Sequence, residues 1–259
     1  MSFHVVDGIR YLTFECFPTN IVHAIFTRHG GLSPAPWNSL NFGGTVGDER
    51  ERVLENRQRA FRALGRDPRS MFDVWQIHSA DVVTAISPGL SGHPEIKADA
   101  IVTDQPGLTL FMRFADCVPI LLHDPCQGVV GVVHAGWQGT VKKILRETVK
   151  TMQAAYNSNP ADILAVIGPS IGPDHYEIGP DVTARVRASF KDAAASLLHA
   201  HNGHIHLDLW AANRLTLEQA GVGQVEVSQH CTACQTDDWY SHRAEKGKTG
   251  RFGALIALA

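Results

Sequence analysis

Hydrophobic residues recur along the chain in two patterns with different periods. Short runs rich in aliphatic and β-branched residues predict strands at 21–27, 81–86, 108–113, 118–123, 129–134, 163–167, 224–227 and 253–258. Apolar positions three and four residues apart predict helices at 49–64, 140–156, 180–194 and 209–220. The mixture predicts an α+β protein.

The order of the predicted elements restricts the topology. Three strands, around Leu108, Val118 and Val129, follow one another without an intervening helix. This order argues against a regular βαβ winding and favours a mixed or antiparallel sheet. Because no linker is long enough to separate independent units, we expect residues 1–259 to form a single domain.

Composition narrows the class of protein. The 259 residues are 44% hydrophobic and 19% charged, as is typical of a globular protein. The net charge is -3 and the charged residues are interspersed, so the sequence lacks the basic surface that nucleic-acid binding needs. The first nine residues do not resemble a signal peptide, and no apolar run is long enough to cross a bilayer, which predicts a cytoplasmic protein. Five cysteines in a reducing compartment indicate thiols or metal ligands rather than disulfides.

The strongest chemical signal lies between residues 115 and 140. Cys117 begins one apolar strand and His134 ends the next, so a hairpin turning at 124–128 would bring the thiol and the imidazole together. His78 lies in a polar interruption before a strand, as expected at a sheet end. Two histidines and a thiolate predict a catalytic zinc site with one open position. The alternative is a buried thiol and two histidines satisfied by backbone carbonyls.

Polar and aromatic residues near both ends suggest substrate contacts. Asn41 and Arg57 flank a turn and the start of a helix, and Asp48 is expected to be the N-cap of that helix. Arg243 and Arg251 lie beside aromatic residues, a mixture that suits a planar base and a phosphate, or else a solvated surface patch. The glycine-rich turn after His134 could receive an anion at a helix start, or it could be purely structural.

Two further groups of metal-ligand residue types stand apart from this signal. The segment 199–206 (HAHNGHIH) is predicted to be an exposed hairpin turn, with adventitious copper or nickel capture as the alternative. Cys231 and Cys234 form a CxxC pair without a second pair. A structural zinc would need two more ligands there, which His230 or His242 could only partly supply.

Several of these motifs together resemble the YfiH/FAMIN laccase-domain family, also described as polyphenol oxidase-like and as purine nucleoside phosphorylase. The resemblance covers nearly the whole chain through TRHGGLS, SLNFG, QIH, ADAIVT, ADCVPILL, HAGWQGT, GPSIGPDHYEIG, CT, SHR and TGR. It implies a single α/β/β/α layered sandwich with mixed sheets. Departures from the family pattern fall at Gln138, where an arginine is usual, at Ser170, Asp174 and His175, where cysteines are usual, and at Ala244, which leaves one arginine in the SHRA motif.

The resemblance also implies an activity. The family's zinc ligands fall on His78, Cys117 and His134, the trio found above, with copper as the alternative metal. The implied reactions are phosphate-dependent cleavage of adenosine, inosine, guanosine and methylthioadenosine, and adenosine deamination. Purine nucleosides and phosphate are thus the expected partners, and the expected substrate contacts are Asn41, Arg57, Arg243 and Arg251. Separately from the resemblance, we expect a monomer.

Three rival hypotheses stay open at this stage. A laccase-like copper oxidase needs several HxH motifs, whereas the HxH pairs here lie in one short turn. A cysteine hydrolase would use Cys117 as the nucleophile, activated by His134 or His78, for example on peptidoglycan precursors. A non-enzymatic binding module would hold a structural metal, and chelation would then unfold it.

Overall fold

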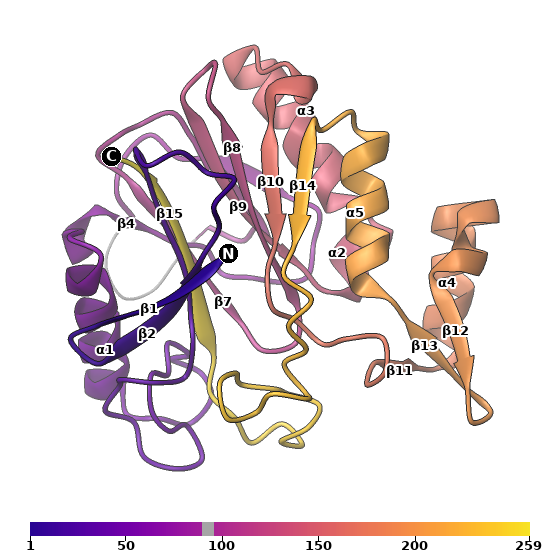
Figure 1. Ribbon diagram of the computed structural model, residues 1–259, viewed down its shortest axis with the longest axis horizontal. Helices are drawn as coiled ribbons and strands as arrows, with labels where there is room; N and C mark the ends of the chain where they lie inside the picture. Colours follow the sequence, from indigo (N-terminus) through magenta and orange to yellow (C-terminus); the bar gives the residue numbers. More distant parts are fainter. Residues whose placement is uncertain (90–95) are drawn as a thin grey trace.

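Two six-stranded sheets packed face to face form the body of the protein (Figure 1). The computed structural model describes residues 1–89 and 96–259. The first sheet has the strand order β1 (Ser2–Val6), β2 (Ile9–Thr13), β3 (Ile21–Phe26), β15 (Phe252–Leu258), β7 (Thr109–Phe114) and β4 (Met71–Phe72). The second has the order β14 (Gln224–Val227), β10 (Leu164–Ile167), β8 (Val118–Asp124), β9 (Val129–Ala135), β6 (Ala100–Thr103) and β5 (Val82–Thr84).

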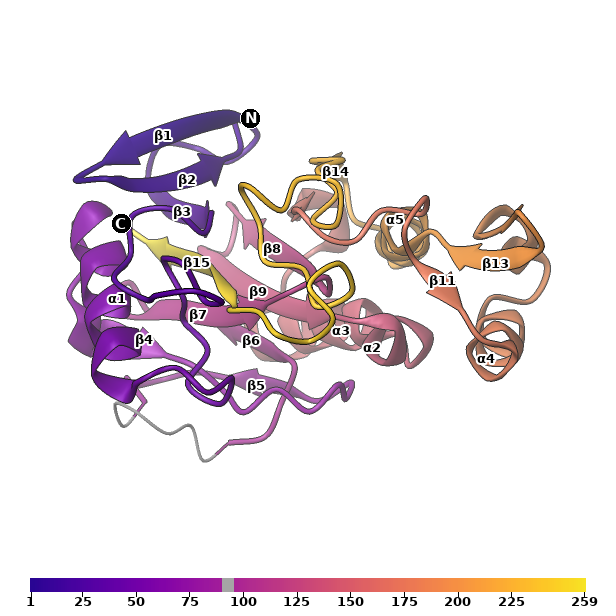
Figure 2. The ribbon, with the colours of Figure 1, turned by 90° about the horizontal axis from the view of Figure 1, so that it is seen from below.

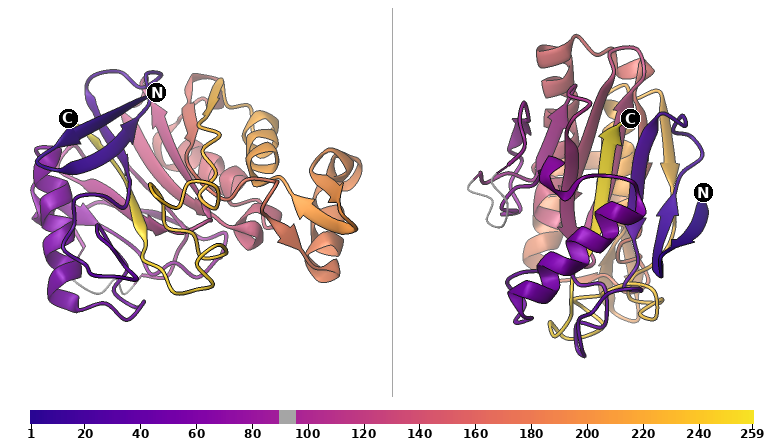
Figure 3. Two further views of the ribbon diagram at one scale, coloured as in Figure 1. Left: turned by 60° about the horizontal axis from the view of Figure 1, so that its bottom comes forward. Right: turned by 90° about the vertical axis from the view of Figure 1, so that its left-hand side faces the viewer.

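Helices cover the two outer faces of this sandwich (Figure 2). Helix α1 (Arg50–Ala63) lies on the first sheet, as the right-hand view of Figure 3 shows, and packs its Phe61 against Phe111 of β7. Helices α3 (Ile144–Tyr156) and α5 (Leu209–Gln219) pack on the second sheet. The predicted α/β/β/α arrangement of mixed sheets is therefore confirmed.

Strand alternation explains how each sheet serves two cores. In β3, Ala24 and Phe26 face α1, whereas Ile25 faces the space between the sheets. In β8, Leu121 faces the first sheet and Ile120 faces the helices. Because strands of the second sheet are covered on both faces, β8 and β9 are buried along their entire length.

The predicted hairpin of β8 and β9 is confirmed. The strands are antiparallel, with Pro119 opposite His134. The side chain of Asp124 shapes the turn by accepting hydrogen bonds from the backbone amides of Cys126 and Gln127 at 2.8 and 3.1 Å. The residue before β8 therefore reaches the same end of the second sheet as the end of β9.

The expected mixed or antiparallel pairing of the three consecutive strands is confirmed, although β7 pairs with β15 and β4 in the first sheet while β8 and β9 pair in the second. Two other local predictions were wrong, for identifiable reasons. The predicted helix 140–156 is split into the five-residue α2 (Trp137–Val141) and α3 by Lys143, which has φ 64°. Asp48 is not the N-cap, a position taken by Glu49, because its carboxylate instead accepts hydrogen bonds from Ser33 and Asn41.

A small third sheet projects from one end of the sandwich (Figure 1). It consists of β11 (Glu177–Ile178), β13 (His204–Leu207) and β12 (Leu198–His201), with α4 (Pro180–Phe190) beside it. The predicted 199–206 hairpin is confirmed, with Asn202 and Gly203 both at positive φ in its turn. Short 3₁₀ turns at Pro68–Ser70, Pro160–Asp162 and Lys191–Ser196 complete the fold. Among the described residues, no helix combines the length and apolar character that spanning a bilayer requires.

Candidate active site

His78, Cys117 and His134 converge at one end of the second sheet. His134 belongs to β9, Cys117 directly precedes β8, and His78 lies in the loop between β4 and β5. Their ligand atoms all lie within 4.8 Å of one another, and the Cys117 sulfur is 3.9 Å from Nε2 of His78. The structure thus brings together the three residues that the sequence proposed as metal ligands.

The spacing and chemistry of this triad suit a zinc ion. Tetrahedral coordination places a thiolate sulfur and an imidazole nitrogen about 3.6 Å apart, close to the Cys117–His78 separation. Gly136 makes this approach feasible, because a Cβ at that position would lie 2.7 Å from the Cys117 sulfur and 3.2 Å from the His78 ring. The glycine that sequence analysis associated with an anion is therefore explained by the packing of the triad.

Asp99, directly before β6, fixes the positions of both histidines. One carboxylate oxygen lies 2.8 Å from Nδ1 of His134. The other accepts hydrogen bonds from the amides of Ile77 and Ser79, at 3.1 and 2.6 Å, and so holds the backbone of His78 at φ 57°. Because Nδ1 of His134 faces Asp99, Nε2 is left to face the ligand cluster, the usual arrangement for a metal-binding histidine.

The electrostatics of the triad favour a thiolate. Burial alone would raise the pKa of Cys117, but the positive charge of His134 and hydrogen bonds from both histidines lower it to about 6. Burial opposes the charged form of His134, but Cys117 and Asp99 raise its pKa to about 9. Likewise, His134 and the Ser79 amide outweigh burial and lower the pKa of Asp99 to about 2. The thiolate is the form of cysteine that binds a metal ion, so the lowered pKa of Cys117 favours binding of a cation.

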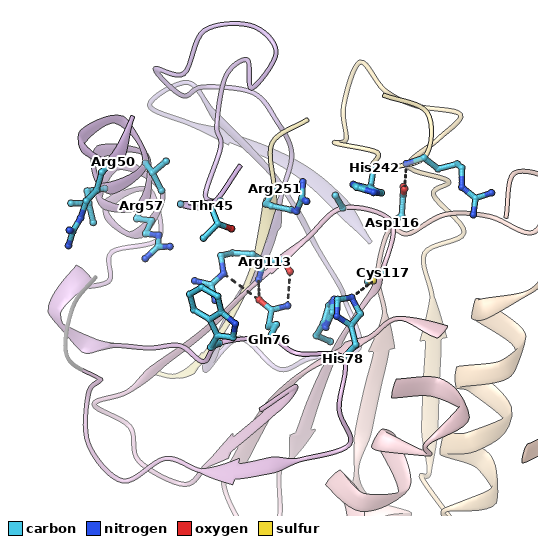
Figure 4. Close-up of a pocket in the computed structure, with 18 of the residues that line it drawn as sticks. Thr45, Arg50, Arg57, Gln76, His78, Arg113, Asp116, Cys117, His242 and Arg251 are labelled. Carbon is cyan, nitrogen blue, oxygen red and sulfur yellow. Dashed lines mark hydrogen bonds between the residues drawn. The ribbon is translucent and has the colours of Figure 1, made fainter. Parts of the chain in front are cut away.

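A cavity of about 610 Å³ opens beside the triad. Figure 4 shows His78 and Cys117 at one end of the cavity, Arg50 and Arg57 at the other, and Arg113 between them. Its walls combine arginines and other polar residues with apolar and aromatic side chains. Besides the residues already placed and His134, the lining consists of Gly43, Gly44, Thr45, Val53, Leu54, Trp75, Gln76, Ala115, Asp116, Tyr176, His242, Arg243 and Arg251. A cavity of this size holds a drug-sized molecule.

Three of the four expected substrate contacts line this cavity. They are Arg57, Arg243 and Arg251. Asn41 is fully buried behind the wall, where its side chain accepts hydrogen bonds from the amides of Gly43 and Arg251 at 2.8 and 2.9 Å. The structure therefore gives Asn41 a supporting position beneath two lining residues.

The arginine end of the cavity carries excess positive charge. Asp73 is shared by Arg113 and Arg57, whose nearest guanidinium nitrogens lie 2.8 and 3.8 Å from the same carboxylate oxygen. Burial and the charge of Arg113 lower the pKa of Arg57 to about 10, so Arg57 still carries its proton near neutral pH. One carboxylate between two guanidiniums leaves a net charge that an anionic ligand would neutralise.

Asp116 is a site residue whose role sequence analysis missed. It lines the cavity next to Cys117, at φ 75°. Its carboxylate accepts hydrogen bonds from the hydroxyl of Thr232 at 2.6 Å and the amide of Arg243 at 2.7 Å. The C-terminal segment is thereby tied to the turn that presents the thiol.

Neither histidine proposed as a partner for the CxxC pair joins it. His230 contacts Gln235, and His242 lines the cavity. His175 instead lies with Cys231 and Cys234, all three ligand atoms within 4.8 Å. The histidines of 199–206 form no such group among the described residues, and the side chain of His206 is bound to the carbonyl of Pro173 at 2.7 Å.

Comparison with known proteins identifies the family. Residues 22–259 match the family described as multi-copper polyphenol oxidoreductase laccase. The chain belongs to this family. The family expected from the sequence motifs is therefore confirmed, although its description names a copper chemistry that the sequence did not favour.

Several proteins that carry names other than laccase are similar to this chain over almost their full length. A purine nucleoside phosphorylase of Deinococcus radiodurans is 41% identical over 238 residues, covering 92% of this chain and 89% of the relative. Purine nucleoside phosphorylase YlmD of Bacillus subtilis is 38% identical, covering 92% and 88%. The crystal structure of the hypothetical protein YfiH from Bacillus licheniformis superposes with a TM-score of 0.92 at 32% identity, covering 99% of each chain.

Proposed function

We propose that this protein is a zinc-dependent purine nucleoside phosphorylase that cleaves adenosine, inosine, guanosine and methylthioadenosine with phosphate, and that it also deaminates adenosine. The observation that carries the proposal is a single cavity with the His78, Cys117 and His134 triad at one end and excess positive charge at the other. The names of the similar purine nucleoside phosphorylases support the phosphorylase part of this proposal.

The walls of the cavity suit a nucleoside and phosphate together. Phosphorolysis breaks the bond between the ribose anomeric carbon and the purine nitrogen, and forms a new carbon–oxygen bond to phosphate. Arg57 and Arg113 would hold the phosphate by charge and fix its orientation. The rings of Trp75 and Tyr176 offer flat apolar surfaces for the purine.

The electron pair of the broken bond leaves with the purine, which takes up a proton. Asp116 and His242 both line the cavity, and a carboxyl group or an imidazole can carry a proton, so these are the groups to test for this transfer. A zinc ion bound to His78, Cys117 and His134 would supply Lewis-acid chemistry at this end of the cavity.

Product analysis of the zinc-loaded protein tests the proposal. Incubated with inosine or methylthioadenosine, it should release the free base and the corresponding sugar 1-phosphate only when phosphate is present. Adenosine without phosphate should yield inosine. His78→Ala and Cys117→Ala should lose these activities, whereas Cys126→Ala, at an exposed thiol of the β8–β9 turn, should keep them.

The rival hypotheses predict different properties of the purified protein. A laccase-like oxidase would carry stoichiometric copper, absorb in the blue region and oxidise phenols. A Cys117 hydrolase would form a trappable acyl-enzyme on that thiol. Absence of any nucleoside turnover by folded, zinc-loaded protein would refute the phosphorylase assignment.

A further inference from the structure

A second cluster of soft ligands lies outside the cavity. Cys231 and Cys234 follow β14, and His175 lies in the turn between β10 and β11. Nδ1 of His175 is 3.5 Å from the Cys234 sulfur and 3.9 Å from the Cys231 sulfur. None of the three residues lines the cavity of the candidate active site.

These separations are those of ligands around one zinc ion. Tetrahedral zinc with sulfur and imidazole ligands places sulfur and nitrogen about 3.6 Å apart, between the two observed values. The amide of Gly172 also donates a hydrogen bond to the Cys231 sulfur at 3.2 Å, a contact that stabilises a thiolate. Gly172 is needed there, because a Cβ would lie 3.2 Å from that sulfur and 3.0 Å from the ring of Trp210.

Backbone pairing places the ligands independently of any metal. Ser170 and Cys231 form an isolated parallel bridge, in which the amide of Ser170 donates to His230 at 3.1 Å and the amide of Thr232 donates to Ser170 at 3.0 Å. The turn that follows closes through the amide of His175, which donates to the Gly172 carbonyl at 3.0 Å. The ligand-bearing turns are thus held together by ordinary hydrogen bonds, and an ion would enter a largely formed site.

We propose that His175, Cys231 and Cys234 bind a second zinc ion, distinct from the ion at His78, Cys117 and His134. Because His175 and Cys234 are exposed, the fourth position is open to solvent. The ion would connect two segments that border the cavity. One is the turn directly before Tyr176, which lines the cavity, and the other carries Thr232, which donates a hydrogen bond to Asp116. The site does not depend on the reaction proposed above.

Zinc stoichiometry of the folded protein tests this second site. The protein is prepared under reducing conditions, equilibrated with zinc and freed of loose metal, and zinc per chain is measured by elemental analysis. The wild type should hold two equivalents. Cys234→Ser and His175→Asn should each hold one, and Cys126→Ser, a matched change at another exposed thiol, should hold two. These exposed positions are chosen because Cys231 is buried and its replacement could prevent folding.

Cobalt substitution assigns the thiolates to their sites. His78→Ala should retain a sulfur-to-cobalt charge-transfer band from the second site, and the combination of His78→Ala with Cys234→Ser should lose most of it. Equal zinc in the wild type, Cys234→Ser and His175→Asn, or a Cys231–Cys234 disulfide in the reduced preparation, would each overturn the proposal. Because these readouts are metal content and absorption, a failure of the phosphorylase assignment would leave them unchanged.

Discussion

Replacing Asp99 with asparagine isolates the contribution of one carboxylate to the metal site. Asparagine has nearly the same shape, but one of its two polar groups is a donor. In the wild-type protein, one Asp99 oxygen accepts hydrogen bonds from the amides of Ile77 and Ser79, and the other oxygen faces Nδ1 of His134. Only one of these sides can keep an oxygen in Asp99→Asn.

The orientation of the new amide follows from the cost of each choice. Turning its NH₂ group toward the loop would leave the backbone donors of Ile77 and Ser79 without this acceptor, at about 1–3 kcal/mol for the buried Ser79 amide. Turning the NH₂ group toward His134 changes the hydrogen bond of only one ring nitrogen, so this orientation has the lower free energy. Nδ1 of His134 must then accept a hydrogen bond, which moves the ring proton to Nε2 and blocks the nitrogen that faces the metal.

The expected result is a weaker metal site in a folded protein. Loss of such a supporting contact lowers zinc affinity about 10–100-fold, equivalent to about 1.4–2.7 kcal/mol. Competition with a chelating indicator dye measures this affinity, and circular dichroism confirms the fold. Asp104→Asn, at an exposed position at the other end of β6, is the matched control and should bind zinc like the wild type. An unchanged affinity in Asp99→Asn would show that Asp99 does not set the His134 tautomer.

Three other substitutions test the packing and charge of the site. Gly136→Ala should displace the Cys117 thiol and lower zinc affinity at least tenfold in the same dye assay, whereas Gly107→Ala, whose added methyl would meet no atom within 4 Å, should not. Arg57→Gln should raise the KM for phosphate about 10–100-fold, because it removes a charged contact worth about 1.5–3 kcal/mol, and should change the KM for the nucleoside little. Arg62→Gln, at an exposed position, is the control, and an equal effect of this change would contradict the role of Arg57. Leu121→Ala, in the fully buried space between the sheets, should lower the free energy of unfolding by about 2–5 kcal/mol in a denaturant titration, and a loss below 1 kcal/mol would contradict the packing described.

The sequence predicted the parts of the site that depend on local pairing. Cys117 and His134 lie at matching ends of two strands joined by a short turn, so strand patterns alone were sufficient to bring them together. The layered fold, by contrast, came from the family resemblance. Strand patterns could not show that β7 leaves its neighbours in sequence to pair with β15, because partner choice depends on which faces the helices cover.

The two aspartates were missed because their partners are distant in sequence. Asp99 contacts a residue 20 positions before it, and Asp116 contacts residues 116 and 127 positions after it. A usable signal was nevertheless present, since both aspartates occur in the sequence Ala-Asp beside an apolar strand, where an unpaired buried carboxylate would be costly.

Both aspartates serve the same physical purpose. Each side chain accepts two hydrogen bonds that fix a left-handed backbone residue at the triad, Asp99 at His78 and Asp116 at its own position before Cys117. Such conformations are unfavourable for residues other than glycine, so they persist only where neighbouring contacts hold them. The triad is therefore positioned by hydrogen bonds within the protein, and a metal ion would bind to a site whose geometry is already set.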